Sequence, residues 1–383
     1  MIAGIPKETF PGENRVALIP AGIASLKKIG VDVLVESGAG STAGFTDEAY
    51  REKGAEITSA RSDIFSKSDV VLQVRGFGAN PDHGGSDVKM MKAGQVNIGF
   101  LEPLTAKAEM KALADAKVTA FAMELIPRIT RAQSMDALSS MANLAGYKAV
   151  LLAANHLPKI FPMMMTAAGT IIAAKVFIVG VGVAGLQAIA TAKRLGAMVS
   201  AYDIRPAVKE QVQSLGAKFV EMELDTGDSE TSGGYAKAMD EEFYKKQREM
   251  MLKVVAESDV VITTAAVPGK KAPILVTEEM VKGMNPRSVV VDLAAERGGN
   301  CEITEPGEII VKHDVTIVGT TNLPSAIPFH ASQTYSKNVT NLMGLLVKEG
   351  KLDLNMEDEI ISGTVVTNDG QVVNARVKEI LGL

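Results

Sequence analysis

Short apolar runs alternate with amphipathic stretches along the first third of the chain. The intervening segments, such as Ala21–Ile29 and Asp47–Lys53, place apolar residues at helical spacing. Strands separated by helices in this way pair in parallel, with helices on both faces of the sheet. The pattern therefore predicts a doubly wound parallel sheet, with strands at Ile2–Ile5, Val31–Val35, Val70–Val74, Gln95–Phe100 and Val118–Phe121.

The same alternation returns between residues 176 and 320. It predicts a second α/β domain with a doubly wound, Rossmann-like parallel sheet. Two further segments, 132–152 and 331–347, have helical spacing and few helix breakers, so we expect long helices that link the two domains. The first domain is then residues 1–137 with about 348–383, and the second is about 145–330. The strands of the second sheet are expected near Val176, Met198, Lys218, Val260, Ser288 and Val315.

Two local patterns outside these sheets carry predictions of their own. Ile360–Val366 and Val372–Val373 flank the turn residues Asn368–Gly370, which is typical of a β-hairpin. Phe161–Met165 contains three consecutive methionines. Methionine is usually core filler, but three in a row cannot all face one core. Either a core or a subunit interface is therefore compatible with this cluster.

A glycine-rich fingerprint follows the strand Val176–Val179. Gly180 permits a tight turn from strand to helix, and Gly182 lets a pyrophosphate approach the backbone. Gly185 lets the helix pack closely on the strand, and the amides at the helix N-terminus attract phosphate. Asp203, at the end of the next apolar run, is placed to accept hydrogen bonds from an adenosine ribose. Together these features predict dinucleotide binding.

The acidic residue at the end of this second strand also indicates which dinucleotide is bound. A carboxylate that bonds a ribose 2′-hydroxyl repels a 2′-phosphate, so Asp203 favours NAD(H) over NADP(H). Arg205 lies two residues further on and could accept a 2′-phosphate. We give it the secondary role, because Asp203 lies where the ribose arrives.

Composition narrows the class of protein. The 383 residues are enough for two domains, and a net charge of −5 argues against a nucleic-acid partner. Cys301 is the lone cysteine, which excludes a disulfide framework. The four histidines show no metal-ligand spacing, so no metal is expected. The start lacks the basic region of a signal peptide, and no apolar run reaches the roughly 20 residues that span a bilayer. We expect a soluble chain.

A polar stretch, Thr226–Gly234, interrupts the second domain just before Tyr235. Loops of this length inside a compact domain are either functional lids or tolerated insertions. As a lid, the stretch would close over bound nucleotide, with the Tyr235 ring covering the ligand.

Several segments resemble a known family. Gly4–Glu8 and Glu13–Leu18 are similar to the opening of the superfamily that joins alanine dehydrogenase and proton-translocating transhydrogenase. The transhydrogenase branch is indicated by five segments: Pro127–Ser140, Asn143–Lys148, Gly233–Lys237, Thr263–Lys270 and Val291–Cys301. The chain resembles the NAD(H)-binding component, domain I or the alpha-1 subunit, of nicotinamide nucleotide transhydrogenases. The resemblance implies hydride transfer between bound NAD(H) and NADP(H) held by a partner, coupled to proton translocation by a membrane component.

The sister activity needs groups that this chain lacks. Alanine dehydrogenases use an arginine, a lysine, a histidine and an aspartate around the substrate. Here Arg15 is retained, whereas Arg75, Asn97 and Glu296 stand at the other three positions. Neither an asparagine nor an always-charged arginine shuttles a proton at neutral pH. Hydride transfer between two nicotinamide rings moves no proton in the chemical step, so these residues favour transhydrogenation.

The resemblance also implies roles for individual residues. Arg128 and Asp136 are expected to pair and orient the carboxamide or pyrophosphate, and Gln133 to reach the partner's nucleotide. Without the resemblance, Arg128 and Asp136 would be interpreted as a surface ion pair. The other residues at family contact positions are Ser134, Met135 and Ser139, and, around the adenosine end, Val183, Ile204, Arg205, Gly234, Gln247 and Ala266.

The expected assembly is a homodimer that joins an NADP(H)-binding component and a membrane-spanning component at the cytoplasmic face of the inner membrane. Two other functions remain open at this point. One is a free-standing amino-acid dehydrogenase, and the other is a non-catalytic nucleotide sensor. Reduction of NAD by the chain with L-alanine would support the dehydrogenase. Hydride transfer only with an added NADP(H)-binding protein would support the transhydrogenase.

Overall fold

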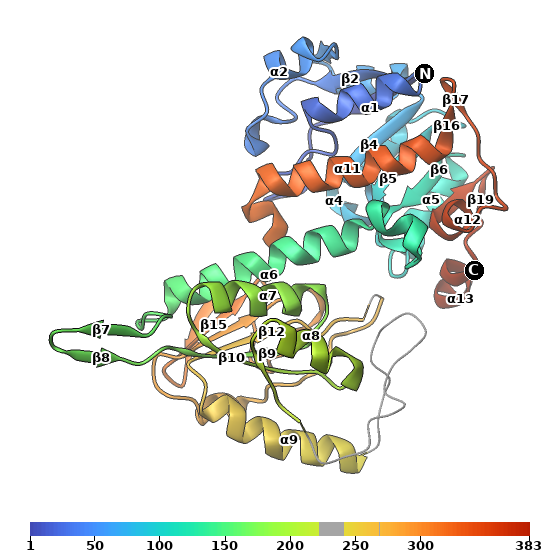
Figure 1. The fold of residues 1–383 in the computed structure, drawn as a ribbon. Helices are drawn as coiled ribbons and strands as arrows, with labels where there is room; N and C mark the ends of the chain where they lie inside the picture. The colour runs from blue at the N-terminus through green and yellow to red at the C-terminus, as the bar shows by residue number, and fades with distance from the viewer. Residues whose placement is uncertain (222–240, 268) are drawn as a thin grey trace. The chain divides into compact units, whose positions relative to one another are not determined.

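The computed structural model describes residues 1–221, 241–267 and 269–383. They form two compact units (Figure 1): unit 1 is Met1–Met141 with Pro324–Leu383, and unit 2 is Ala142–Leu323. The sequence placed the corresponding boundaries near residues 137, 145, 330 and 348. The lid expected at Thr226–Tyr235 lies outside the described residues.

Unit 1 is built on an eight-stranded sheet of order β19-β18-β6-β5-β4-β1-β2-β3. Strands β1 to β6 pair in parallel, whereas β18 and β19 are antiparallel. The parallel strands have the 3-2-1-4-5-6 order of a doubly wound sheet, which confirms the predicted fold class. The strands are β1 (Ile2–Ile5), β2 (Asp32–Glu36), β3 (Glu56–Thr58), β4 (Val70–Arg75), β5 (Val96–Phe100), β6 (Thr119–Ala122), β18 (Val365–Asn368) and β19 (Gln371–Val372).

Helices complete unit 1. The longest that lies wholly within it is α11 (Pro328–Leu346), whose inward face buries Tyr335, Val339 and Leu342. The sequence assigned residues 331–347 to a helix linking two domains; in the structure α11 lies in unit 1. The other helices of unit 1 are α1 (Ile23–Lys28), α2 (Asp47–Glu52), α3 (Arg61–Lys67), α4 (Pro81–Met90), α5 (Lys107–Asp115), α12 (Glu359–Thr364) and α13 (Ala375–Leu381).

Unit 2 repeats the doubly wound arrangement in a seven-stranded sheet of order β11-β10-β9-β12-β13-β15-β14. All neighbours pair in parallel except β14, which is antiparallel to β15. The strands are β9 (Lys175–Val179), β10 (Met198–Tyr202), β11 (Lys218–Phe219), β12 (Val260–Thr263), β13 (Val289–Asp292), β14 (Ile309–Lys312) and β15 (Val315–Gly319). Its helices are α7 (Val183–Arg194), α8 (Lys209–Ser214), α9 (Glu241–Ala256) and α10 (Glu278–Lys282).

Long helix α6 (Ala137–His156) starts in unit 1 and continues into unit 2. The sequence expected a long helix here, at residues 132–152. In the structure residues 130–135 instead form the short 3-10 segment η5 (Thr130–Met135). Within the described residues, no helix is both long and apolar enough to cross a membrane.

Two predicted local structures differ from the observed ones. Residues 360–364 were expected in a strand but belong to α12, because the Asp358 carboxylate accepts the Ile360 amide at 2.8 Å and caps the helix. The hairpin itself is present as β18 and β19. The methionine cluster opens a second hairpin, β7 (Met164–Thr166) with β8 (Gly169–Ile171), which the sequence did not predict. Figure 1 shows it projecting from the body of unit 2. A last two-stranded piece pairs β16 (Val347–Lys348) with β17 (Lys351–Leu352).

Candidate functional site

The glycine-rich turn of unit 2 has the backbone that a dinucleotide needs. Gly180 follows β9 with φ +94°, a conformation that side chains disfavour. A Cβ on Gly185 would lie 2.0 Å from the Gly180 oxygen, so only glycine allows α7 to pack this close. A Cβ on Gly182 would meet nothing within 4 Å, so this side of the turn is open to a ligand. Gly182 caps α7 without a side-chain bond, which leaves the first amides for an anion.

The turn lies at the point where the strand order of unit 2 reverses. Strands β9 and β12 are neighbours there, and open α/β sheets bind ligands at this edge. The Thr264 hydroxyl, just after β12, donates to the Gly180 oxygen at 2.8 Å. The segments that leave the two strands are therefore tied together across the switch point.

Asp203 lies after β10 and is bonded to the glycine turn and to Arg205. The Val181 amide donates to Asp203 Oδ2 at 2.7 Å. The Arg205 amide and Nε both donate to Oδ1 at 2.9 Å, and Arg205 Nη2 donates to Oδ2 at 2.9 Å. Because a carboxylate offers about four acceptor positions, a ribose hydroxyl can bond Asp203 only by sharing or replacing one of these donors. Arg205 also donates to the Val181 oxygen at 3.1 Å.

A buried carboxylate that sequence reasoning missed organises the segment after β12. Asp292 is fully buried and accepts bonds from Thr263, Thr304 and three backbone amides. One of these amides belongs to Asn300, whose side chain accepts the Ala265 amide and donates to the Ala265 oxygen. Asn300 thereby holds the segment that carries Ala266. The signal in the sequence was the Val291–Cys301 motif, which showed a family but no role.

The remaining residues predicted at the adenosine end are placed as follows. Val183 is the first residue of α7, and Ile204 lies between Asp203 and Arg205. Gln247 lies on α9 and donates to the Tyr202 hydroxyl at 3.0 Å, so it lies against the end of β10. Gly234 and Tyr235 lie outside the segments that the structure describes.

The loop predicted to act at the nicotinamide end lies in unit 1. Arg128 and Gln133 are exposed, whereas Met135 is buried. The Asp136 carboxylate accepts the Ser139 amide at 2.9 Å and the Ser139 hydroxyl at 2.6 Å, which caps the start of α6. The Ser134 oxygen accepts bonds from side chains of α11.

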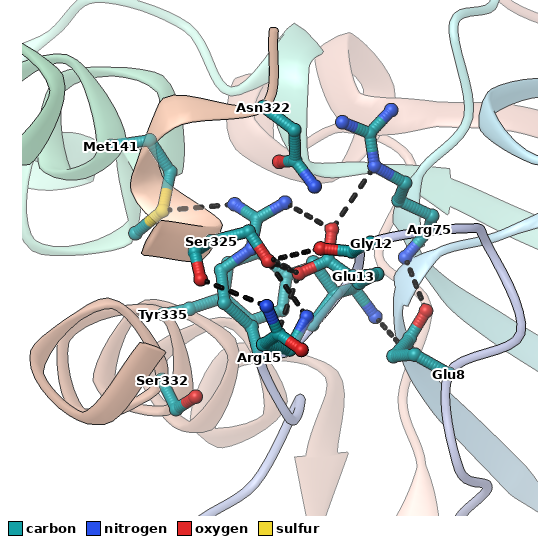
Figure 2. A network of polar contacts seen from close by, with 12 residues as sticks. Glu8, Gly12, Glu13, Arg15, Arg75, Met141, Asn322, Ser325, Ser332 and Tyr335 are labelled. Carbon is teal, nitrogen blue, oxygen red and sulfur yellow. Dashed lines mark hydrogen bonds and ion pairs between the residues drawn. The ribbon is translucent and has the colours of Figure 1, made fainter. Parts of the chain in front are cut away.

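A polar network follows β1 and β4, the switch point of unit 1 (Figure 2). Its centre is Glu13, which accepts Arg15 Nε at 2.7 Å, Arg15 Nη2 at 2.6 Å and Arg75 Nε at 3.1 Å. The Ser325 hydroxyl adds a bond at 3.1 Å. Burial alone would raise the pKa of Glu13, but the two guanidinium groups outweigh it and lower the pKa to about 2. Arg15 and Arg75 thus already share an internal carboxylate.

Other members of the network are also engaged. Glu8 accepts the Val74 and Arg75 amides, and burial together with the Glu13 charge raises its pKa to about 8. The Asn97 amide is buried and donates to Gln73 Oε1 at 2.9 Å, so its nitrogen is already bonded. Glu296, in unit 2, accepts the Asn322 amide at 2.7 Å. Among the described residues, no cluster of three or more histidine, cysteine or acidic side chains could hold a metal ion.

These features define a class: a two-unit α/β protein with a Rossmann-type nucleotide fold at the switch point of unit 2. The chain belongs to the alanine dehydrogenase/PNT family. The N-terminal domain model of that family matches residues 4–145, and the C-terminal domain model matches residues 149–375. The resemblance seen in the sequence is therefore confirmed.

Named relatives lie in both branches of the family. The chain is 52% identical over 377 residues, 98% of each chain, to the first component of NAD(P) transhydrogenase subunit alpha from Rhodospirillum rubrum. It is similar to the crystal structure of transhydrogenase from Sinorhizobium meliloti, with a TM-score of 0.87 and 46% identity over 97% of this chain and all of that one. A solved L-alanine dehydrogenase has a TM-score of 0.83 at 25% identity, covering 100% of this chain and 99% of that one.

Proposed function

We propose that this chain is the NAD(H)-binding component of a proton-translocating NAD(P) transhydrogenase, with the Si/Re specificity of that class. The observation that carries the proposal is 52% identity across 98% of both chains to the alpha-subunit component of the Rhodospirillum rubrum transhydrogenase. Its similarity to a solved L-alanine dehydrogenase is lower, at 25% identity. The partner holds NADP(H), and a membrane component couples the transfer to proton movement.

The residues of unit 2 fit a bound NAD(H). The open face at Gly182 and the uncapped amides of α7 suit the pyrophosphate, and Asp203 suits the ribose of an unphosphorylated adenosine. Bound NAD(H) supplies or accepts the hydride at its nicotinamide ring. The chain's own contribution is to bind the nucleotide, orient it and exclude water. Arg128, Gln133 and Asp136 are proposed to act at the nicotinamide end, with Ser134, Met135 and Ser139 beside them.

Two features of unit 1 support hydride transfer over amino-acid oxidation. An asparagine amide, at position 97, cannot take up and return a proton as a histidine does. The guanidinium groups of Arg15 and Arg75 are held by Glu13, so a substrate carboxylate would compete with an internal one. A transhydrogenase needs neither a proton shuttle nor a carboxylate clamp for its chemical step.

The hairpin of unit 2 supports the proposed homodimer. Met163, Met165 and Ile172 are 63%, 74% and 76% exposed at or beside β7 and β8. Apolar side chains gathered on a projecting element favour burial in a protein interface. The dimer is proposed to lie at the cytoplasmic face of the membrane, held there by its partner components.

The experiment that tests the function compares two assays of the purified chain. With a transhydrogenase NADP(H)-binding component, it should transfer hydride between NADH and an NADP analogue. Alone, it should not reduce NAD with L-alanine. Reduction of NAD by alanine at a rate typical of a dehydrogenase would favour the runner-up, a free-standing amino-acid dehydrogenase. Nucleotide binding with neither activity would favour a sensor.

Gln133 provides the sharpest mutational test of the proposal. Gln133→Asn shortens an exposed side chain by one methylene, so NADH affinity should change little. Single-turnover hydride transfer should fall by about tenfold or more, because the rings are misplaced only in the two-protein complex. Equal losses in transfer and in NADH affinity would assign Gln133 to NAD binding alone. An unchanged transfer rate would remove it from the site.

A further inference from the structure

The loop that carries Gln133 is held at the residues on either side of it. Before it, Arg131 makes two bonds to Asp358, from Nη1 to Oδ2 at 2.7 Å and from Nη2 to Oδ1 at 2.9 Å. After it, the carbonyl oxygen of Ser134 accepts Nδ2 of Asn338 at 3.0 Å and Nδ2 of Asn341 at 2.9 Å. The side chain between these two anchors is exposed.

The second anchor is unusual in using two amides for one oxygen. Asn338 and Asn341 are three positions apart on α11, so they share a face of the helix. A carbonyl oxygen accepts two hydrogen bonds, and here both come from these side chains. The Ser134 peptide is therefore fixed in position and in orientation by a 19-residue helix of unit 1.

The environment of Asn338 indicates a role other than stability. Its side chain is buried, and its own Oδ1 has no hydrogen-bond partner among the described residues. A buried amide oxygen left unbonded destabilises the folded state, and an apolar residue of similar size would avoid that cost. What Asn338 supplies at this position is the donor to Ser134.

We propose that Asn338 and Asn341 are positioning residues for hydride transfer. By fixing the Ser134 carbonyl they fix the backbone of Gln133, and so the place from which its side chain reaches the partner's nucleotide. The proposal rests on the proposed function. Displacements of about 1 Å at a reacting centre can lower a rate by as much as about 100-fold, so the orientation of this one peptide matters.

The test uses the full chain with a transhydrogenase NADP(H)-binding component. In Asn341→Asp a nearly isosteric oxygen replaces the donor and repels the Ser134 oxygen. Single-turnover hydride transfer should fall by about tenfold, whereas equilibrium NADH affinity and the urea midpoint should change little. Asn341→Gln keeps an amide donor and should recover some of the rate. Gln333→Ala, at an exposed position of α11, is the matched control and should behave as wild type.

A second measurement needs no partner. Trypsin cleavage after Arg128 and Arg131, followed by mass spectrometry, reports how firmly the loop is held. Asn341→Asp and Asn338→Asp should accelerate this cleavage, and Gln333→Ala should not. If Asn338→Asp does not fold, the half-buried Asn341 variant still decides the matter.

The outcomes separate the inference from the function on which it rests. Loss of NADH affinity in proportion to transfer, or wild-type transfer and cleavage in Asn341→Asp, would overturn the positioning role. A wild-type mixture that transfers no hydride would overturn the proposed function. The cleavage experiment would then still decide whether the two amides hold the loop.

Discussion

At the scale of single residues, Asp203 and Arg205 act as one unit. The guanidinium makes two bonds to the carboxylate and one to the Val181 oxygen, so it ties the end of β10 to the glycine turn. The pairing keeps the guanidinium engaged, and a 2′-phosphate would have to compete with Asp203 for it. Preference for NAD(H) would then have two sources, repulsion by the acid and retention of the arginine.

Asp203→Ala tests both sources. NADH binding should weaken by about 1–3 kcal/mol, the cost of losing a charge-assisted hydrogen bond. NADPH should gain affinity, because Arg205 is released and can meet the 2′-phosphate. Nucleotide fluorescence titrations measure both. Adding Arg205→Gln should abolish the gain for NADPH; a gain that persists, or wild-type protein that binds NADPH as well as NADH, contradicts this account.

At the scale of elements, Glu124 joins the ends of β5 and β6. Its Oε1 accepts the Leu101 amide at 2.8 Å and the Glu102 amide at 2.6 Å. Burial, with the Glu102 charge, raises its pKa from 4.5 to about 7. The folded state therefore prefers the protonated form. The stabilisation from this group is complete below pH 4.5 and is lost as the pH rises through 7.

Glu124→Gln should remove that pH dependence while leaving an oxygen to accept both amides. Relative to wild type, the free energy of unfolding of the variant should rise by up to about 3 kcal/mol between about pH 5 and about pH 8.5. Urea unfolding at both pH values measures the change. Glu52→Gln, at an exposed position of α2, is the control. Parallel pH profiles for Glu124→Gln and wild type would show that Glu124 does not titrate in this range.

At the scale of the whole molecule, the β7–β8 hairpin is the exposed apolar feature that most needs a partner. Sedimentation at micromolar concentration should give about twice the chain mass of 40.4 kDa. Ile172→Lys should shift the equilibrium toward monomer, because a buried charge opposes association. Met198→Lys, at a residue 55% exposed elsewhere in unit 2, should not. A monomeric wild type would leave the methionine cluster without an interface.

The sequence by itself determined the class of fold, because its signals are local. Buried parallel strands read as continuous apolar runs, and a strand-to-helix turn of this tightness needs glycine at position 180. The observed β9 and β10 match those runs, and the family is confirmed. Short or exposed elements escaped, such as β3, β14 and the β7–β8 hairpin, because few of their residues are buried. The roles of the predicted site residues stay predictions.

The tertiary structure alone decided which polar groups meet. Asn338 and Asn341 lie 204 and 207 residues from Ser134, Ser325 lies 312 residues from Glu13, and no periodicity announces such pairs. Capping by Asp358 turned an apolar run at 360–364 into helix α12, although its composition suited a strand. Apolar patterning sets where the chain is buried through area alone. A hydrogen bond needs a particular donor and acceptor within about 3 Å, and only the completed fold fixes that distance.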